Sequence, residues 1–325
     1  MSNRRPCVSV FMDVEDPIHL LADDAALELA EVFDRARVRG SFCVTGEKCR
    51  VLLRRGREDV VEALRKHCLG LHTDTHSRHP TTMERLADLP FGQGCKAALE
   101  AERPGFESFV SAFGRPPAFW GGAGNTWAPE ITDALKALGI PAYAYALTQV
   151  PEHQVHRFNG VLAFPQHVSV SEAEWADDDL ASAAAERVFA ALRERAGAWT
   201  GLFVGHPTRF RFPSFWDGAF FGGQTAPNFE SLEPVAPELY DRARGNLARF
   251  LVRLREAAAI EGLDDVTPTL ERWIPAGEGE RRFFREQTPL ALHAAARWPV
   301  HRPDLRADGI VEKTLALEST LEVEG

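Results

Sequence analysis

The sequence has few cysteines, no long apolar run and no excess of positive charge, and each absence excludes a class of protein. Its five cysteines are odd in number and none lies in a Cys-x-x-Cys pair. This argues against a disulfide framework and against a zinc knuckle held by cysteines. No apolar stretch approaches the length of a membrane span. The formal net charge is -10 at pH 7, so we expect neither nucleic acid nor an anionic membrane as a partner.

The first residues, MSNRRPCVSVFMDVEDP, place two arginines before an apolar stretch, as a signal peptide does. The apolar stretch, Cys7 to Met12, is too short for a signal peptide, and acidic residues follow it at once. We therefore expect a cytoplasmic protein. Apolar residues make up 45% of the 325, which is enough for a large core.

Apolar segments with strand and helix periodicity alternate along most of the chain. We expect strands at residues 7–14, 41–46, 68–72, 117–122, 140–147, 160–165 and 201–207. Between them we expect helices at 25–40, 47–67, about 83–113 (broken near Pro90 and Pro104), 127–139 and 179–196. This alternation is typical of an α/β protein with a parallel sheet or barrel.

The chain changes character after residue 225, and we divide it there into a main domain, 1–225, and an extension, 226–325. The extension contains one clear amphipathic stretch, at 237–259, followed by charged and proline-containing segments without a chemical motif. We expect it to pack on the main domain. Its role is left open between a lid, an oligomer contact and a specificity element.

Titratable side chains follow three of the expected strands. Asp13, Glu15 and Asp16 end the first, His72 and His76 follow the third, and His206 follows the last. Ligands of parallel α/β folds bind outside the carboxyl ends of the strands, so we expect these groups to meet at one mouth.

Two histidines and a carboxylate at such a mouth indicate a catalytic metal site with an open position. The spacing of four between His72 and His76 suits a helical turn, which would point both rings the same way. The spacing alone is common and unspecific. Its place after a buried strand, opposite an acidic strand end, makes it informative. Zinc is the default metal for two imidazoles and a carboxylate, with cobalt, nickel and manganese as alternatives.

Five segments occur in the order found in polysaccharide deacetylases of the NodB-homology type, carbohydrate esterase family four. They are VFMDVEDP, GSFCVTGE, HCLGLHTDTHSRHP, FWGGAGNTWAPEITDALKALG and GLFVGHP. The chain resembles that family from about residue 6 to residue 207, and the resemblance implies a distorted (β/α)7 barrel.

The resemblance also implies roles for single residues. Asp13 matches the catalytic base, His72 and His76 the metal-binding histidines, and His206 the general acid. The carboxylate ligand falls on Glu15 or Asp16. We favour Asp16, because its shorter side chain restricts the metal geometry more.

The chain departs from the family at the arginine that pairs with the catalytic base, where it has Trp120. Arg209 or Arg211 could replace that arginine from another loop. Aromatic residues crowd the segment after His206. Since aromatic faces stack on sugar rings, we name Trp120, Trp216 and Arg209 as candidate substrate contacts.

Two functions follow from these observations. The first is a metal-dependent hydrolase that cleaves a C–N amide bond, as in N-deacetylation of an amino sugar or a related small metabolite. The second is a catalytically degenerate protein of the same fold that binds a ligand or a metal without turnover. The expected partner is a small molecule or a glycan, and self-association is left open.

Overall fold

The first strand shows how the sequence builds the fold. The structure, a computed structural model, describes residues 5–146, 155–195, 197–218 and 232–270. In β1 (Cys7–Val14) side chains alternate between two faces, as they do in any strand. Val8, Val10, Met12 and Val14 join the apolar layer beneath the helices, whereas Phe11 joins a separate apolar cluster on the other face. Asp13 shares the face of Phe11.

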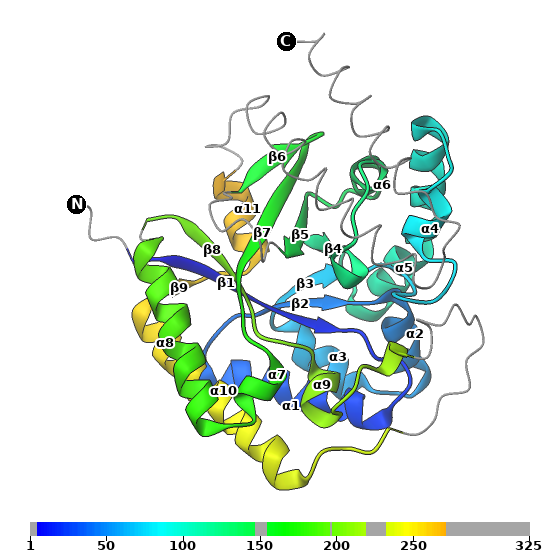
Figure 1. Ribbon diagram of the computed structural model, residues 1–325. Helices are drawn as coiled ribbons and strands as arrows, with labels where there is room; N and C mark the ends of the chain where they lie inside the picture. The colour runs from blue at the N-terminus through cyan, green and yellow to red at the C-terminus, as the bar shows by residue number, and fades with distance from the viewer. Residues whose placement is uncertain (1–4, 147–154, 196, 219–231, 271–325) are drawn as a thin grey trace.

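Seven parallel strands close into a barrel, so the predicted distorted (β/α)7 barrel is confirmed (Figure 1). Around the ring the order is β1, β2, β3, β4, β5, β7 and β8, and β8 pairs again with β1. β6 adds to β7 in antiparallel orientation, and β9 adds to the start of β1. The bounds are β2 Ser41–Val44, β3 Cys68–Leu71, β4 Phe119–Gly121, β5 Ala142–Ala146, β6 His156–Phe158, β7 Val161–Ser169, β8 Trp199–Phe203 and β9 Ala259–Ile260.

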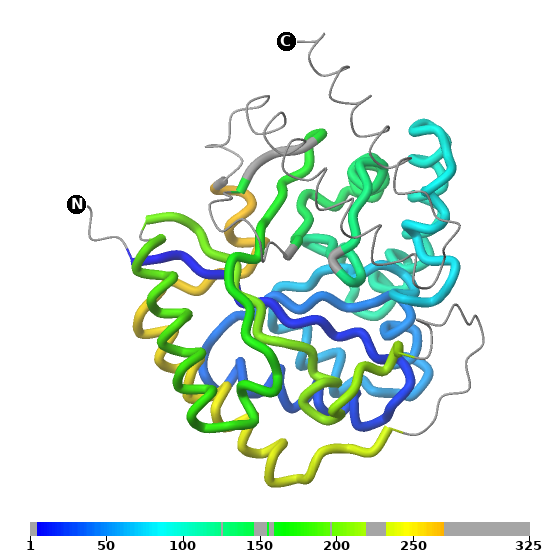
Figure 2. Tube along the Cα trace, in the orientation of Figure 1, coloured from blue at the N-terminus to red at the C-terminus, as the bar shows by residue number. Residues whose placement is uncertain are grey.

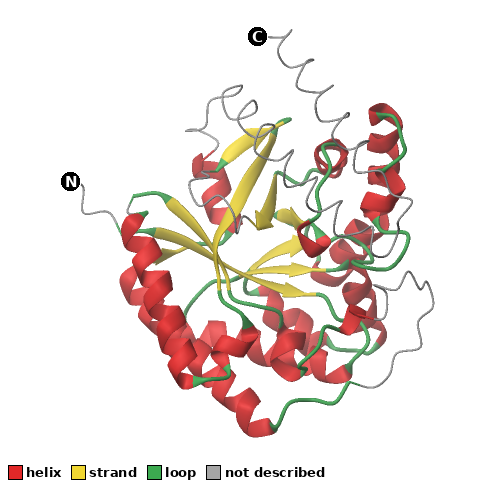
Figure 3. Cartoon of the chain, viewed as in Figure 1, coloured by secondary structure: helices red, strands yellow, loops and turns green. Residues whose placement is uncertain are grey.

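Helices form an outer layer around the strands (Figure 3). Their bounds are α1 Leu20–Ala36, α2 Gly46–Arg54, α3 Glu58–Arg65, α4 Thr82–Leu86, α5 Phe91–Phe113, α6 Glu130–Leu138, α7 Glu172–Trp175, α8 Asp178–Glu194, α9 Pro207–Arg211, α10 Pro237–Ala257 and α11 Leu263–Leu270, with a 3-10 turn at Ala123–Asn125. No helix of the part described here has the length and apolar character that a membrane span needs.

Two helix predictions were wrong in detail. The single helix expected at 47–67 is split into α2 and α3 at Gly56, whose φ of 64° lies in the left-handed region that ends helices. The break expected near Pro104 is absent, because α5 continues through that residue. Packing explains the continuity: Gly105 lies so close to Asp74 that a Cβ there would come within 2.8 Å of the Asp74 backbone. Tertiary contact overrides the local preference of proline here.

The described part of the extension lies against the barrel. Helix α10 packs against α1, α7 and α8, and Figure 2 shows it running beside α8. Strand β9 pairs with Cys7 and Val8, and the Ser9 hydroxyl donates a hydrogen bond of 2.8 Å to the Glu261 carbonyl. The boundary proposed at residue 225 falls outside the described residues.

Candidate metal centre and active site

The carboxyl ends of neighbouring strands bring the predicted site residues together. β1, β2 and β3 run side by side in one direction (Figure 1), with Val14 paired to Val44 and Val44 to Leu71. Glu15 directly follows β1, and His72 directly follows β3. β8 lies on the other side of β1 and leads to His206. The chain therefore places all three titratable strand ends at one end of the barrel, as expected.

Glu15, His72 and His76 form a buried group whose ligand atoms all lie within 4.8 Å of one another. Glu15 Oε2 lies 2.9 Å from His76 Nε2 and 3.4 Å from His72 Nε2. Two imidazoles and one carboxylate in this arrangement are a known donor set for a catalytic divalent cation, which leaves further positions open.

The remaining ring nitrogens are held by neighbours that fix the orientation of both histidines. His72 Nδ1 donates a hydrogen bond of 3.0 Å to the Gly121 carbonyl, which leaves Nε2 as the nitrogen that can coordinate a metal. His76 Nδ1 contacts the Ser77 hydroxyl and lies 3.3 Å from Asp217 Oδ2. The Ser77 hydroxyl in turn donates to Asp217. Such outer partners are typical of metal-binding histidines, so the donor set fits a divalent cation.

The segment that carries the histidines is not a helical turn, which corrects the expectation from their spacing. Thr73 and His76 have φ values of 57° and 52°, both in the left-handed region. The Thr73 hydroxyl accepts a hydrogen bond from the His76 backbone N–H at 3.1 Å. The tight loop still brings the two rings to a centroid distance of 5.0 Å.

Asp16 is turned away from the histidines, so our preference for it as the carboxylate ligand was wrong. Its Oδ1 accepts hydrogen bonds from the backbone N–H groups of Ile18 and His19. Its Oδ2 accepts from the Thr208 hydroxyl at 2.7 Å and contacts His19 Nδ1 at 2.9 Å. Asp16 therefore stabilises the loop that leads into α1, and Glu15 alone of the two faces the imidazoles.

Asp13 and His206 face each other beside this group. Asp13 Oδ2 lies 3.8 Å from His72 Nε2 and 4.0 Å from His206 Nε2. The side chains of Asp13 and His206 are each 17% exposed, so both are reachable from solvent.

His206 is held by Glu172, a residue that the sequence analysis missed. Glu172 Oε1 accepts from the His206 backbone N–H and contacts its Nδ1, both at 2.7 Å. The close approach needs a glycine before the histidine: Gly205 has a φ of 118°, and a Cβ there would come within 2.8 Å of Glu172 Oε1. The expected strand at 160–165 ended too early to show the available signal, which is that Glu172, in SEAEW, closely follows β7 (Val161–Ser169).

Burial and charge together shift the pKa values of the group. Burial raises the pKa of Asp13, although His72 and His206 oppose it. Burial also disfavours the charged form of Glu15, but His76 and His206 outweigh it and hold its pKa well below the usual range. For His206, burial is outweighed by Glu15 and Glu172, which raise its pKa to about 9. His206 therefore carries its proton near neutral pH, as a general acid must.

Neither arginine named above replaces the missing partner of Asp13. The Arg209 guanidinium lies 4.9 Å from the centre of the Phe215 ring and donates to the Phe212 carbonyl. Arg211 lies over the Tyr240 ring. Over the described ranges, the ion pairs of Asp13 involve only His72 and His206.

Trp120 points out of the barrel, so it is not placed to contact a substrate. Its neighbour Phe119 belongs to the barrel interior, whereas Trp120 belongs to the apolar layer beneath the helices and is 1% exposed. Its indole N–H donates to buried Glu102 on α5 at 3.0 Å. Neighbouring side chains of a strand point to opposite faces, so Phe119 and Trp120 cannot both face the barrel interior.

Trp216 packs against the metal centre and contacts both Glu15 and His76. Its indole N–H donates to Glu15 Oε1 at 3.1 Å, and its ring lies 5.5 Å from that of His76. It is 3% exposed, whereas the preceding Phe215 is 39% exposed and packs edge-on against His206. The aromatic surface nearest the candidate acid is therefore Phe215, with Arg209 behind its ring.

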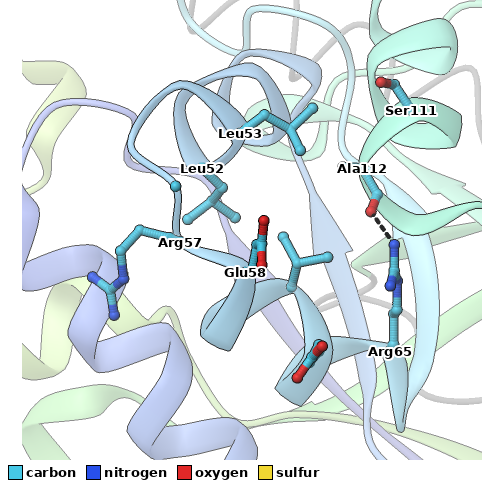
Figure 4. Close-up of a pocket in the computed structure, with 10 residues that line it drawn as sticks. Leu52, Leu53, Arg57, Glu58, Arg65, Ser111 and Ala112 are labelled. Carbon is cyan, nitrogen blue, oxygen red and sulfur yellow. Dashed lines mark hydrogen bonds between the residues drawn. The ribbon is translucent and has the colours of Figure 1, made fainter.

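A separate pocket of about 300 Å³ lies among α2, α3 and α5 (Figure 4). Its lining includes Leu53, Arg57 and Glu58, and Arg65 donates to the Ala112 carbonyl at its edge. None of the candidate site residues lines it, and its own charged side chains are Arg57, Glu58, Glu62 and Arg65.

Comparisons with known proteins identify the fold. No protein-family model matches the sequence, and no curated protein matches it. Among solved structures, the chain is similar to a Mycobacterium smegmatis protein assigned as a polysaccharide deacetylase, with a TM-score of 0.53 and 15% identity. The match covers 84% of this chain and 93% of that one. A 4-alpha-glucanotransferase from Thermococcus litoralis also matches, with a TM-score of 0.53 and 11% identity over 82% of this chain and 40% of that enzyme.

The chain thus has the barrel fold of the NodB-type polysaccharide deacetylases. Because the 4-alpha-glucanotransferase shares the fold but has a different activity, the fold alone does not define what this protein does.

Proposed function

We propose that the protein is a metal-dependent hydrolase that cleaves a C–N amide bond, with an N-acetylated amino sugar or a related small molecule as substrate. The observation that carries the proposal is the grouping of Glu15, His72 and His76 beside Asp13 and His206. An acid, a base and a cation site within a few ångströms are what amide hydrolysis at neutral pH requires.

A divalent cation, with zinc as the default for this donor set, supplies Lewis-acid polarisation of the carbonyl and makes water more acidic. Glu15, His72 and His76 would hold it. Asp13 takes the proton of the attacking water. His206, held by Glu172, gives its proton to the departing nitrogen, and the products are a short carboxylic acid and an amine.

Phe215 offers an exposed aromatic face beside the leaving-group side of this arrangement, where a sugar ring could stack. Trp216 and Asp217 act indirectly, by holding Glu15 and His76.

The alternative is a degenerate site that binds metal or ligand without turnover. One observation favours it: Asp13 lacks an arginine partner in the described part of the chain, and burial raises its pKa. A base with a raised pKa is ionised in a smaller fraction of molecules at acidic pH.

The test is to measure bound metal, and then acid release from a panel of N-acetylated sugars, before and after chelation and reloading. The hydrolase proposal predicts release that disappears with chelator and returns with metal. Asp13→Asn and His206→Gln should each lower the rate on the order of 100-fold or more while the metal content stays unchanged. Metal that binds without any release across the panel would favour the degenerate site.

A further inference from the structure

Cys43 lies directly beneath the candidate metal centre. It sits on β2 opposite Asp13, with which it is in register. Its side chain belongs to the apolar cluster of the barrel interior together with Phe11 and Phe119, and it is 2% exposed. The thiol therefore lies beside Asp13 and His72, on the side of β2 that faces the barrel interior.

Asp13, Cys43 and His72 form a second group with the geometry of a cation site. Their ligand atoms all lie within 4.8 Å of one another. Ligand atoms around tetrahedral zinc are roughly 3.5 Å apart, from metal–ligand distances of about 2.0 to 2.3 Å. Movements of about an ångström by the ligand atoms therefore suffice to bring all three within bonding distance of one ion.

Gly121 keeps the thiol and the imidazole side by side. A Cβ at this position would come within 2.9 Å of Cys43 Sγ and 3.3 Å of His72 Nδ1. No side chain separates the two groups, and the Gly121 carbonyl fixes the ring of His72.

We propose that Asp13, Cys43 and His72 form an alternative, thiolate-containing coordination set, the inner set. It shares His72 with the outer set, which is Glu15, His72 and His76. This inference rests on the metal centre of the proposed function and deepens it. A thiolate selects softer ions, so zinc, cobalt and cadmium would enter this inner set, whereas magnesium and manganese would not. Binding releases the thiol proton to water.

The inner set has a consequence for catalysis. A cation held there takes Asp13 as a ligand, and a carboxylate bound to a cation is a poor base. An ion in the inner set, zinc and cobalt included, therefore does not support hydrolysis, which needs the same ion in the outer set, Glu15, His72 and His76.

The test is to titrate the metal-free, full-length protein with Co²⁺ and follow sulfur-to-cobalt charge transfer in the near ultraviolet, with bound cobalt measured in parallel. The wild type should show the band. Cys43→Ser should lose it while still binding cobalt through the outer set, and Cys43→Ala serves as a second variant if serine disturbs the barrel. Cys49→Ser is the matched control, because Cys49 is equally buried but lies in the layer beneath the helices.

The outcomes separate this inference from the function on which it rests. Cobalt bound without the band, or a band that persists in both Cys43 variants, overturns the inner set and leaves the metal centre intact. No bound cobalt at all overturns both. A band that depends on Cys43 supports the inner set. Acid release by cobalt-loaded Cys43→Ser, which keeps only the outer set, then tests the hydrolase, and no release from the substrate panel overturns it.

Discussion

His67 gives the sharpest test of how burial controls the stability of this protein. It lies between α3 and β3, 2% exposed, with its ring against Phe42. Nε2 donates to the Ala30 carbonyl at 3.1 Å, and Nδ1 accepts from the Gly40 backbone N–H at 3.4 Å. Both nitrogens are thus used by the neutral ring, and a second proton on Nδ1 would face the N–H of Gly40.

Burial lowers the pKa of His67 to about 4. Between pH 6.5 and 4 the unfolded chain binds a proton at this residue and the folded chain does not, so the free energy of unfolding falls as the pH falls through that window. The difference from the unfolded value of about 6.5 corresponds to about 3.4 kcal/mol.

His67→Gln keeps a donor for the Ala30 carbonyl and removes the titration. At pH 7 we expect the variant to be less stable by about 1 kcal/mol, through lost packing and one weaker hydrogen bond. Towards pH 4 we expect it to gain up to about 3.4 kcal/mol relative to the wild type. Urea unfolding at a series of pH values measures both curves, and the NMR titration of the His67 ring measures its pKa directly. A constant difference between the two curves would refute the reasoning.

Three further predictions concern carboxylates. Burial raises the pKa of Glu102 to about 7, so the wild type should lose stability as the pH rises from about 4.5 through 7. Glu102→Gln has no such titration, and urea unfolding at pH 8 should show it to be more stable than the wild type by up to about 3 kcal/mol. Removing the charge beside His206 should lower the pKa of that ring, so in Glu172→Gln the alkaline limb of the kcat/KM profile should move to lower pH; an unmoved limb would mean that Glu172 is only structural. Equilibrium dialysis should show that Glu15→Gln weakens metal binding at least 10-fold, whereas Asp16→Asn binds metal normally and lowers only the free energy of unfolding, by about 1 to 3 kcal/mol; equal metal loss in both would contradict the assignment of Glu15.

The barrel and the meeting of its strand ends could be predicted, because buried strands alternate with amphipathic helices and parallel strands share one carboxyl edge. Strand β1 was expected at its observed bounds. The short elements α7, α9, β9 and α11 were missed, since so few residues carry no measurable periodicity.

Within the site, the choice between Glu15 and Asp16 could not be made from side-chain length. It is decided by hydrogen bonds to Asp16 from the backbone N–H groups of Ile18 and His19 and from Thr208, which lies 192 positions away in the sequence. Glu172 was missed for a similar reason, because its link to His206 spans 34 residues and depends on a glycine backbone conformation.

The pairing of β9 with the start of β1 constrains the order in which strands can pair while the protein is being synthesised. β1 acquires this neighbour only when residues 259 and 260 have been made, and the Ser9–Glu261 bond joins positions 252 apart. Until then the N-terminal edge of β1 presents unpaired backbone groups to its surroundings. Until residue 259 has been made, a nascent chain of this protein is therefore open to wrong strand pairing at this edge, and truncation before residue 259 should leave the edge unpaired.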